Sequence, residues 1–237
     1  MTPRRKTVHG VSIGILMLDT GFERLPGDIG YAPTWPFPVH YRIVKGATGV
    51  RLLSQGGGGL LDHFVEAAND LVEMGVDGIA TSCGFLALFH KELTARCPVP
   101  VATSSLLQIP FVQSMLPAGK RIGVLTADSD ALTADHFRAV GCPTDLPVVG
   151  VPPTGVFRKD FRSPSLKVDP KAQEEEVLGM AARLLGENRD IGAIVLECTN
   201  LAPYSASIAE TFQIPVFDVV TLVNWLHAGL RPTRYQR

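Results

Sequence analysis

The sequence lacks the patterns that would assign it to several large classes of protein. It has four cysteines in 237 residues, at positions 83, 97, 142 and 198, and no two of them lie close together. This spacing fits neither a disulfide framework nor a zinc site. The six histidines form no His-Glu-x-x-His pattern, so we expect no metal site.

The chain also has little net charge and no long apolar run. Its formal net charge is −1, which gives no electrostatic reason to expect binding to nucleic acid or to an anionic membrane. No segment reaches the roughly 18 apolar residues that a membrane span requires. The apolar run 11–18 has no small-residue cleavage site after it, so we interpret it as a strand and not as a signal peptide. We expect a cytoplasmic protein.

Two of the cysteines each follow a short apolar run. Cys83 follows the run 76–82 and Cys198 follows the run 191–197, and a helix-compatible stretch comes after each. Such runs, rich in Ile, Val and Ala, are typical of a parallel α/β sheet, in which ligands bind beyond the carboxyl ends of the strands. The start of the next helix favours the thiolate, so we expect a lowered pKa for both thiols.

The two halves of the chain repeat each other. Cys83 and Cys198 are 115 positions apart, and Pro100 and Pro215 are separated by the same distance. An Ile-Gly-x-Leu run also recurs, at an offset of 109. Three matched landmarks in the same order favour a duplication, although similar strands in any α/β protein are the alternative explanation.

Alternating strand-like and helix-like segments predict parallel β-α-β units. Strands are expected at 11–18, 39–45, 76–82, 99–102, 121–126, 147–151, 191–197 and 214–217. Helices are expected at 60–74, 85–95, 104–116, 129–140, 171–186, 202–210 and 219–230. The Pro-containing segments 20–38 and 152–168 break the pattern, and we expect both to be irregular and to close over a central cleft.

Three motifs together resemble the aspartate/glutamate racemase superfamily. They are one cysteine in each half, Asp19-Thr20-Gly21 after the first strand, and Cys198-Thr199 after a late strand. The resemblance implies an α/β fold of two similar lobes, each with a mainly parallel sheet flanked by helices. The lobes are expected to be related by a pseudo-twofold axis, with the active site at their interface.

The resemblance also implies a division of the chain and a chemistry. Residues 1–104 plus 218–237 are expected to form the first lobe and residues 105–217 the second. Catalysis would need no cofactor, and the protein would form a homo-oligomer. Cys83 and Cys198 would transfer protons on the two faces of a small-molecule carboxylate substrate. The candidate substrate-binding residues are Asp19, Thr20, Ser82, Gly84, Phe85, Thr126, Thr199 and Asn200.

This chain departs from the glutamate racemase pattern at both cysteines. It has Cys-Gly-Phe at 83–85 in place of Cys-Asn-Thr, and Glu-Cys-Thr-Asn at 197–200 in place of Gly-Cys-Thr-His. Phe85 replaces a hydroxyl that would help to hold an amino-acid carboxylate. Glu197 would raise the pKa of the neighbouring thiol if it points inward. We therefore expect a substrate other than glutamate, one that is larger or more apolar.

Three functional hypotheses follow. The first is a cofactor-independent racemase or epimerase that inverts the α-carbon of an amino acid or related carboxylate through a two-thiol proton relay. The alternative within the superfamily is a cis–trans isomerase or decarboxylase of a small dicarboxylate. The third is a small-molecule binding protein without turnover.

Overall fold

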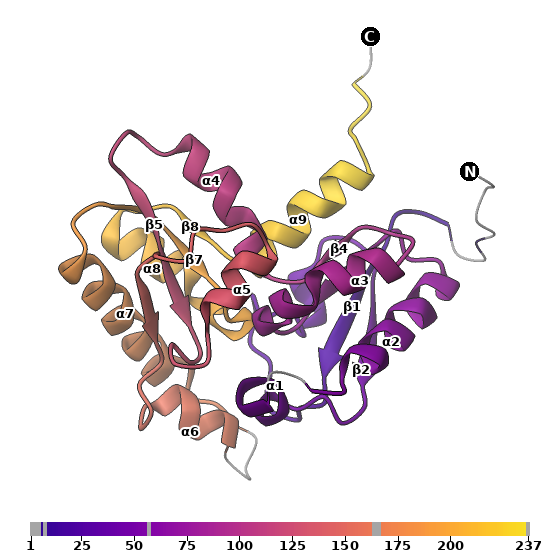
Figure 1. Ribbon diagram of the computed structural model, residues 1–237, viewed down its shortest axis with the longest axis horizontal. Coiled ribbons are helices and arrows are strands. Elements are labelled where there is room, and N and C mark those ends of the chain that lie inside the picture. The colour runs from indigo at the N-terminus through magenta and orange to yellow at the C-terminus, as the bar shows by residue number, and fades with distance from the viewer. Residues whose placement is uncertain (1–5, 7–8, 56–57, 163–166, 236–237) are drawn as a thin grey trace.

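Two four-stranded parallel sheets lie side by side, one in each half of the chain (Figure 1). The computed structural model describes residues 6, 9–55, 58–162 and 167–235. The strand order is β2-β1-β3-β4 in the first sheet and β6-β5-β7-β8 in the second. The two sheets therefore have the same topology, and the predicted fold of two similar α/β lobes is confirmed.

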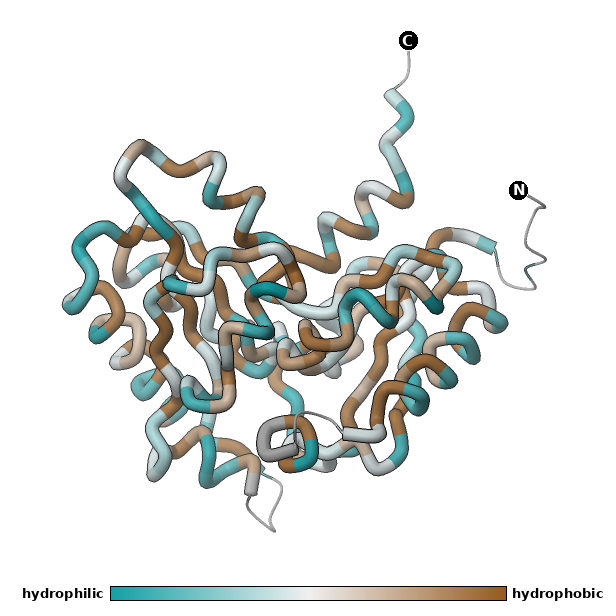
Figure 2. Tube along the Cα trace, in the orientation of Figure 1, coloured by the Kyte–Doolittle hydropathy of each residue, from teal (hydrophilic) through white to brown (hydrophobic). Residues whose placement is uncertain are grey.

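The strands occupy the segments expected from their apolar runs. They are β1 (Ile13–Leu18), β2 (Val39–Val44), β3 (Gly78–Thr81), β4 (Val101–Ala102), β5 (Arg121–Thr126), β6 (Val148–Gly150), β7 (Ile191–Leu196) and β8 (Val216–Phe217). All residues of β1 and β3 are buried, as are all but one residue in each of β5 and β7. Burial on both faces of a parallel sheet explains why these runs are almost continuously apolar. Figure 2 shows apolar residues concentrated along these strands.

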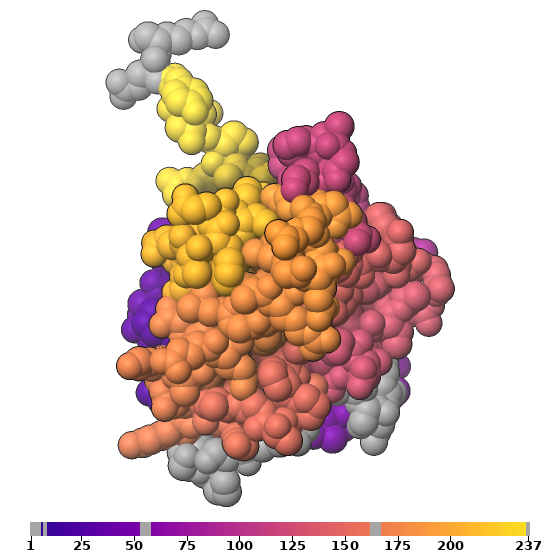
Figure 3. All heavy atoms as spheres, turned by 90° about the vertical axis from the view of Figure 1, so that its left-hand side faces the viewer, coloured from indigo at the N-terminus to yellow at the C-terminus, as the bar shows by residue number. Residues whose placement is uncertain are grey.

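Helices connect the strands and cover both faces of each sheet. The α-helices are α1 (Gly49–Gln55), α2 (Leu61–Met74), α3 (His90–Arg96), α4 (Ile109–Met115), α5 (Ala134–Ala139), α6 (Val156–Arg162), α7 (Pro170–Glu187), α8 (Ser205–Phe212) and α9 (Val219–Leu230). Four 3-10 helices are also present in the described part of the chain: η1 (Ala32–Thr34), η2 (Gly84–Phe89), η3 (Ser105–Gln108) and η4 (Thr199–Tyr204). Helix α7 covers the outside of the second lobe (Figure 3), and residues 231–235 after α9 project from the molecule.

The prediction of an irregular segment at 152–168 was wrong in part. Residues Val156–Arg162 form helix α6, while 163–166 lie outside the described residues. The start of α6 is held by Glu176, which accepts hydrogen bonds from the backbone N–H groups of Val156 and Phe157 at 2.7 and 3.1 Å. This cap comes from another helix and leaves no local sequence signal. Helix α1 was not expected either, whereas η1 is the one helical turn in segment 20–38.

The last helix returns to the first lobe. Val219 and Val223 of α9 are buried in a cluster with Ile13, Ile15 and Ala80 of the first sheet. A side chain on Gly78 of β3 would come within 2.9 Å of Leu230. Helix α9 therefore covers one face of the first sheet, and α2 covers the other through a separate apolar cluster.

The two lobes are interlocked by the helices that follow β3 and β7. Phe85 and Ala87 of η2, in the first half, belong to an apolar cluster with Val124 and Val195 of the second sheet. In the opposite direction, Ala202 of η4 packs in the cluster of the first sheet. Each lobe thus contributes a short helix to the core of the other, which fixes the two sheets relative to each other.

Candidate active site

A pocket of about 370 Å³ lies between the lobes, at the carboxyl ends of both sheets. Its lining comes from the residues that follow β1, β3, β5 and β7, and from helices α1 and α6. Figure 1 places α1 and α6 at the same end of the molecule, below the two sheets. The volume is in the range of small-ligand sites, and the carboxyl ends of parallel strands are where such sites are expected.

Nine of the ten residues selected from the sequence line this pocket. They are Asp19, Thr20, Ser82, Cys83, Gly84, Phe85, Cys198, Thr199 and Asn200. The tenth, Thr126, is not among the lining residues. It is fully buried, and its hydroxyl donates a 2.6 Å hydrogen bond to Oε2 of Glu197. Thr126 is therefore placed to hold Glu197 and not to contact a ligand.

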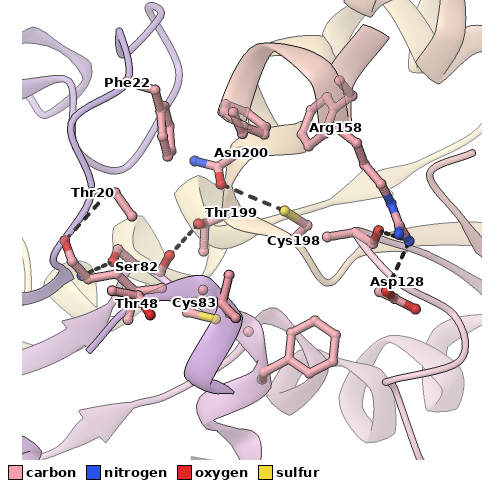
Figure 4. A pocket seen from close by; sticks show the side chains of 18 of the residues that line it. Thr20, Phe22, Thr48, Ser82, Cys83, Asp128, Arg158, Cys198, Thr199 and Asn200 are labelled. Atoms are coloured by element: carbon pink, nitrogen blue, oxygen red, sulfur yellow. Dashed lines mark hydrogen bonds and ion pairs between the residues drawn. The ribbon is translucent and has the colours of Figure 1, made fainter. Parts of the chain in front are cut away.

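The two thiols come from equivalent positions of the two lobes. Cys83 is the residue before η2 and Cys198 is the residue before η4, both with an extended backbone. Figure 4 shows the two side chains extending from their separate elements into one space. The arrangement can present two proton-transferring groups to one bound molecule.

The expectation of lowered thiol pKa values was wrong. Backbone N–H groups at the start of η2 do favour the Cys83 thiolate, but burial and the Glu197 carboxylate raise the pKa of Cys83 to about 12. Burial and Glu197 also raise the pKa of Cys198 well above its ordinary value. Removing the charged form from water outweighs the N–H groups of a short 3-10 helix. Both thiols are therefore protonated at neutral pH.

Glu197 points inward and reaches the pocket. Its side chain is fully buried, and Oε1 has no hydrogen-bond partner among the described residues. Burial raises the pKa of this carboxyl to about 7, although the hydrogen bond from Thr126 acts in the opposite direction. A carboxyl that titrates near neutral pH beside two thiols is suited to proton exchange.

Gly84 is needed because the turns that carry the two thiols touch. A Cβ atom at this position would lie 2.1 Å from Oε1 and 2.2 Å from the carbonyl oxygen of Glu197. Position 199 corresponds to position 84 at the 115-residue offset, and there the Thr199 hydroxyl donates a 2.8 Å hydrogen bond to the carbonyl of Ser82. The absence of a side chain at 84 and the hydroxyl at 199 together allow the lobes to meet at the site.

Asn200 connects the second thiol to residues of the first lobe. The Cys198 sulfur lies 3.9 Å from Oδ1 of Asn200, whose amide group donates a 2.7 Å hydrogen bond to Asp28. Asp28 forms an ion pair with Arg24, and Arg24 donates a hydrogen bond to the Thr20 hydroxyl. This chain of contacts fixes one wall of the pocket through segment 20–38.

Helix α6 supplies another wall, which meets segment 20–38. Phe157, Arg158 and Phe161 line the pocket, and the Arg158 guanidinium is paired with Asp128 at 3.0 Å (Figure 4). The Phe161 ring lies 4.2 Å from the Phe22 ring between centroids. Aromatic rings from both lobes therefore meet at the pocket.

Sequence reasoning did not select the six other lining residues that have aromatic, basic or hydroxyl side chains. They are Phe22, Arg24, Thr48, Phe157, Arg158 and Phe161. The available signal was the expectation that segments 20–38 and 152–168 close over a cleft, because five of the six residues lie in them. Thr48 had no such signal, since the turn before α1 was not expected to reach the site.

The described residues contain neither a metal-binding cluster nor a membrane-spanning helix. Within the described ranges, no group of three or more His, Cys, Asp or Glu side chains is arranged to hold a metal ion. The helices of the same ranges include none that is long and apolar enough to cross a membrane.

Comparison with known proteins identifies relatives across nearly the whole chain. A family described as "Asp/Glu/Hydantoin racemase" matches residues 63–226. A protein named dimethylsulfoniopropionate lyase from Durusdinium sp. clade D is 28% identical over 94% of this chain and 76% of its own length. Dimethylsulfoniopropionate lyase 3 from Emiliania huxleyi (strain CCMP1516) is 31% identical over 92% of this chain, which spans 60% of that relative.

A solved structure has the same fold. Allantoin racemase from Klebsiella pneumoniae superposes with a TM-score of 0.68 at 18% identity, over 93% of this chain and 87% of the other. At this identity the likeness establishes the fold alone.

Replacing Gly84 by alanine tests the close contact between the turns. We expect Gly84→Ala to lower the free energy of unfolding by about 3 kcal/mol, because the new methyl group overlaps Glu197. Gly179→Ala in α7 is the matched control, since nothing lies within 4 Å of a Cβ there. This control should stabilise the helix by about 0.5–1 kcal/mol. Urea unfolding measures both changes, and equal stability of the two variants would contradict the contact.

The buried carboxyl predicts how stability depends on pH. The pKa of Glu197 rises from 4.5 to about 7 on folding, so the folded protein holds a proton that the unfolded chain releases. The contribution of Glu197 to the free energy of unfolding therefore falls as pH rises from 4.5 to about 7, and it is constant at higher pH. Relative to Glu197→Gln, the wild type should lose about 2–3 kcal/mol between pH 5 and pH 8. Urea unfolding at both pH values measures this difference. An equal change in the free energy of unfolding of the two proteins would contradict the assignment.

Proposed function

Because the chain belongs to the Asp/Glu/hydantoin racemase family, we propose that it is a lyase that removes a proton next to a carboxylate and expels a sulfonium group. Dimethylsulfoniopropionate, after which the relatives are named, has a carboxylate at one end and a sulfonium at the other. The supporting observation is that two thiols and a group of aromatic rings share one pocket.

The charges of the pocket favour a substrate with a cationic end. Both arginines among the described lining residues are engaged in ion pairs, Arg24 with Asp28 and Arg158 with Asp128. They are therefore less suited to the two carboxylates of a dicarboxylate substrate. Aromatic rings attract cations through the negative faces of their π-systems, so the wall formed by Phe161 suits a sulfonium. The Phe22 ring already holds a cation, because the guanidinium carbon of Arg24 lies 4.1 Å from its centroid.

The reaction requires one base and a leaving group. A thiolate removes the proton from the carbon next to the carboxylate, and the electron pair of that C–H bond forms a C=C bond. The C–S bond to the sulfonium breaks, and its electrons leave with sulfur as neutral dimethyl sulfide. Acrylate remains, and the removed proton stays on the cysteine, which regenerates the thiol.

A cationic substrate also favours formation of the base. The pKa values of Cys83 and Cys198 are raised by burial and by a neighbouring negative charge. A sulfonium within a few ångströms acts in the opposite direction, because an opposite charge stabilises the thiolate. Binding of the substrate therefore prepares the thiol for proton transfer.

A racemase or epimerase that uses both thiols is the second candidate. The observation that favours it is that the two thiols come from opposite lobes, since inversion needs an acid and a base on the two faces of a planar carbanion. Both candidates share the first step, which is removal of a proton next to a carboxylate. They differ in the fate of the carbanion, which either expels a β-group or regains a proton.

Proton NMR in deuterated buffer separates the candidates. With dimethylsulfoniopropionate we expect dimethyl sulfide and acrylate to appear, and we expect Cys83→Ala or Cys198→Ala to lower kcat/KM by about 10²–10⁴-fold. Cys97→Ala is the control, since Cys97 does not line the pocket. Inversion of an amino acid or hydantoin without elimination would establish the racemase instead. Activity of both pocket variants within threefold of wild type would exclude a thiol base.

Replacing an aromatic wall tests the binding of the sulfonium. We expect Phe161→Leu to raise KM for dimethylsulfoniopropionate by about 3–30-fold, which corresponds to loss of a cation–π contact of roughly 0.5–2 kcal/mol. Inhibition by 4-methylpentanoate, which has the same shape but no positive charge, provides the comparison. Its inhibition constant should change much less in the variant. Equal changes for both molecules would show that the ring contributes shape and not charge recognition.

A further inference from the structure

We propose that Glu197 accepts the proton that a pocket thiol must lose before it acts as a base, and that Thr126 is its positioning residue. This inference rests on the proposed function, because it names the group that activates the thiol of the same site. The glutamate racemase pattern has glycine at this position, so the carboxylate of Glu197 is a departure from that pattern.

The position of Glu197 relates it to both thiols. It directly precedes Cys198 in the chain, and its Oε1 lies against Gly84, the residue after Cys83. The same carboxylate raises the pKa of each thiol through its charge. The Glu197 carboxylate is therefore close in structure or sequence to both Cys83 and Cys198.

The two oxygens of Glu197 have different surroundings. Oε2 accepts the hydrogen bond of the buried Thr126 hydroxyl, which fixes the carboxylate plane. Oε1 has no partner among the residues that the structure describes, although it is fully buried. An unsatisfied buried carboxylate oxygen is costly in a site that serves packing alone, whereas it is useful in one that must receive a proton.

The residue of the first lobe that is equivalent to Glu197 has a structural role. Ser82 is equivalent to Glu197 at the 115-residue offset, and its hydroxyl accepts a 2.8 Å hydrogen bond from the backbone N–H of Leu18. In the first lobe, the short side chain of serine is thus enough to accept this backbone hydrogen bond. The carboxylate in the second lobe is longer than this structural role requires.

The proton balance of the cycle is closed. The S–H bond of the thiol breaks and an O–H bond forms at Oε1, which leaves a thiolate and a neutral Glu197. The thiolate takes the substrate proton, and the sulfonium leaves with the electrons of its C–S bond. Glu197 then releases its proton to solvent, and the enzyme returns to a thiol and a carboxylate. Neutralising Glu197 also removes the charge that opposed the thiolate.

Other charged groups also face the pocket. Asp19 lines it and accepts a 3.2 Å hydrogen bond from the backbone N–H of Gly46. The ion pair of Asp128 and Arg158 lies in the same pocket, and Asp28 acts on Cys198 from beyond Asn200. Asp28 is itself paired with Arg24. Because the pKa of Glu197 is about 7, its titration should appear in the pH dependence of activity.

The first test measures kcat/KM for dimethylsulfoniopropionate from pH 5 to pH 9. The wild type should lose activity below about pH 7, where Glu197 is protonated. Glu197→Gln should lower kcat/KM by about 10²–10⁴-fold, and its pH profile should no longer show the acidic limb, which is the fall in activity below about pH 7. Glu210→Gln on the surface of α8 is the matched control and should keep the wild-type profile. A limb near pH 7 that persists in Glu197→Gln overturns the proposal.

Thr126 provides a second variant that does not remove the carboxylate. Its hydrogen bond lowers the pKa of Glu197, so Thr126→Val should move the acidic limb to higher pH. Thr126→Ser, which keeps the hydroxyl, should restore the wild-type position. An unchanged limb in Thr126→Val counts against the role of Glu197, and this variant decides the question if Glu197→Gln does not fold.

Alkylation by iodoacetamide at pH 8, followed at each cysteine by mass spectrometry, needs no substrate. Loss of the carboxylate lowers the thiol pKa values, so Cys83 and Cys198 should react about threefold faster or more in Glu197→Gln. Cys97 serves as the internal reference. Equal rates in the two proteins would overturn the proposal. A wild type that does not act on dimethylsulfoniopropionate, but whose thiols respond in this way, would refute the proposed substrate. It would support the placement of the Glu197 charge beside both thiols, on which the role of Glu197 as proton acceptor depends.

Discussion

The close contact between the turns that follow β3 and β7 is the constraint on which the rest of the site depends. Gly84 lies so close to Glu197 that a Cβ would overlap it, and Thr199 donates a hydrogen bond to the backbone of the opposite lobe. Helices η2 and η4, which begin at these turns, pack into the cores of the facing lobes. Moving one lobe would therefore disturb both cores, so the distance between the thiols is set by packing.

The same contact controls the electrostatics. It encloses Cys83, Cys198 and Glu197 between two sheets, where loss of water raises the pKa of all three groups. Short helices after the cysteines supply N–H groups, but they do not compensate for this burial. Formation of a thiolate at the site therefore depends on groups that compensate its charge in the enclosed space. The groups available are the buried carboxyl of Glu197 and a positively charged substrate.

The walls and the floor of the pocket come from different kinds of structural element. The floor consists of strand ends held by backbone hydrogen bonds, whereas α1, α6 and segment 20–38 supply the walls. Helix α6 is fixed to α7 by the Glu176 carboxylate, and Arg24 and Arg158 are held by acidic partners. Loops on a rigid scaffold are where members of one fold differ in substrate. This division is consistent with relatives of related fold that carry the names of lyases and racemases.

The sequence by itself determined the framework of the protein. Apolar runs of strand length, each followed by a helix, predicted two parallel sheets, and the 115-residue offset brought Cys83 and Cys198 to equivalent strand ends. These predictions succeeded because strand periodicity and the position of ligands at carboxyl ends are local or topological properties. Asp19, Thr20 and Asn200 were expected at the site from the family resemblance and not from strand periodicity, and all three line the pocket.

Only the tertiary structure decided the chemistry of the groups within that framework. The pKa values of the thiols were expected to fall and instead rise, because burial depends on the opposite lobe. Thr126 was expected to contact substrate and instead binds Glu197, and the helix at 156–162 depends on a cap from α7. The division into residues 1–104 plus 218–237 and 105–217 stays a prediction. Contacts between residues far apart in the chain decide these properties, and no local pattern records them.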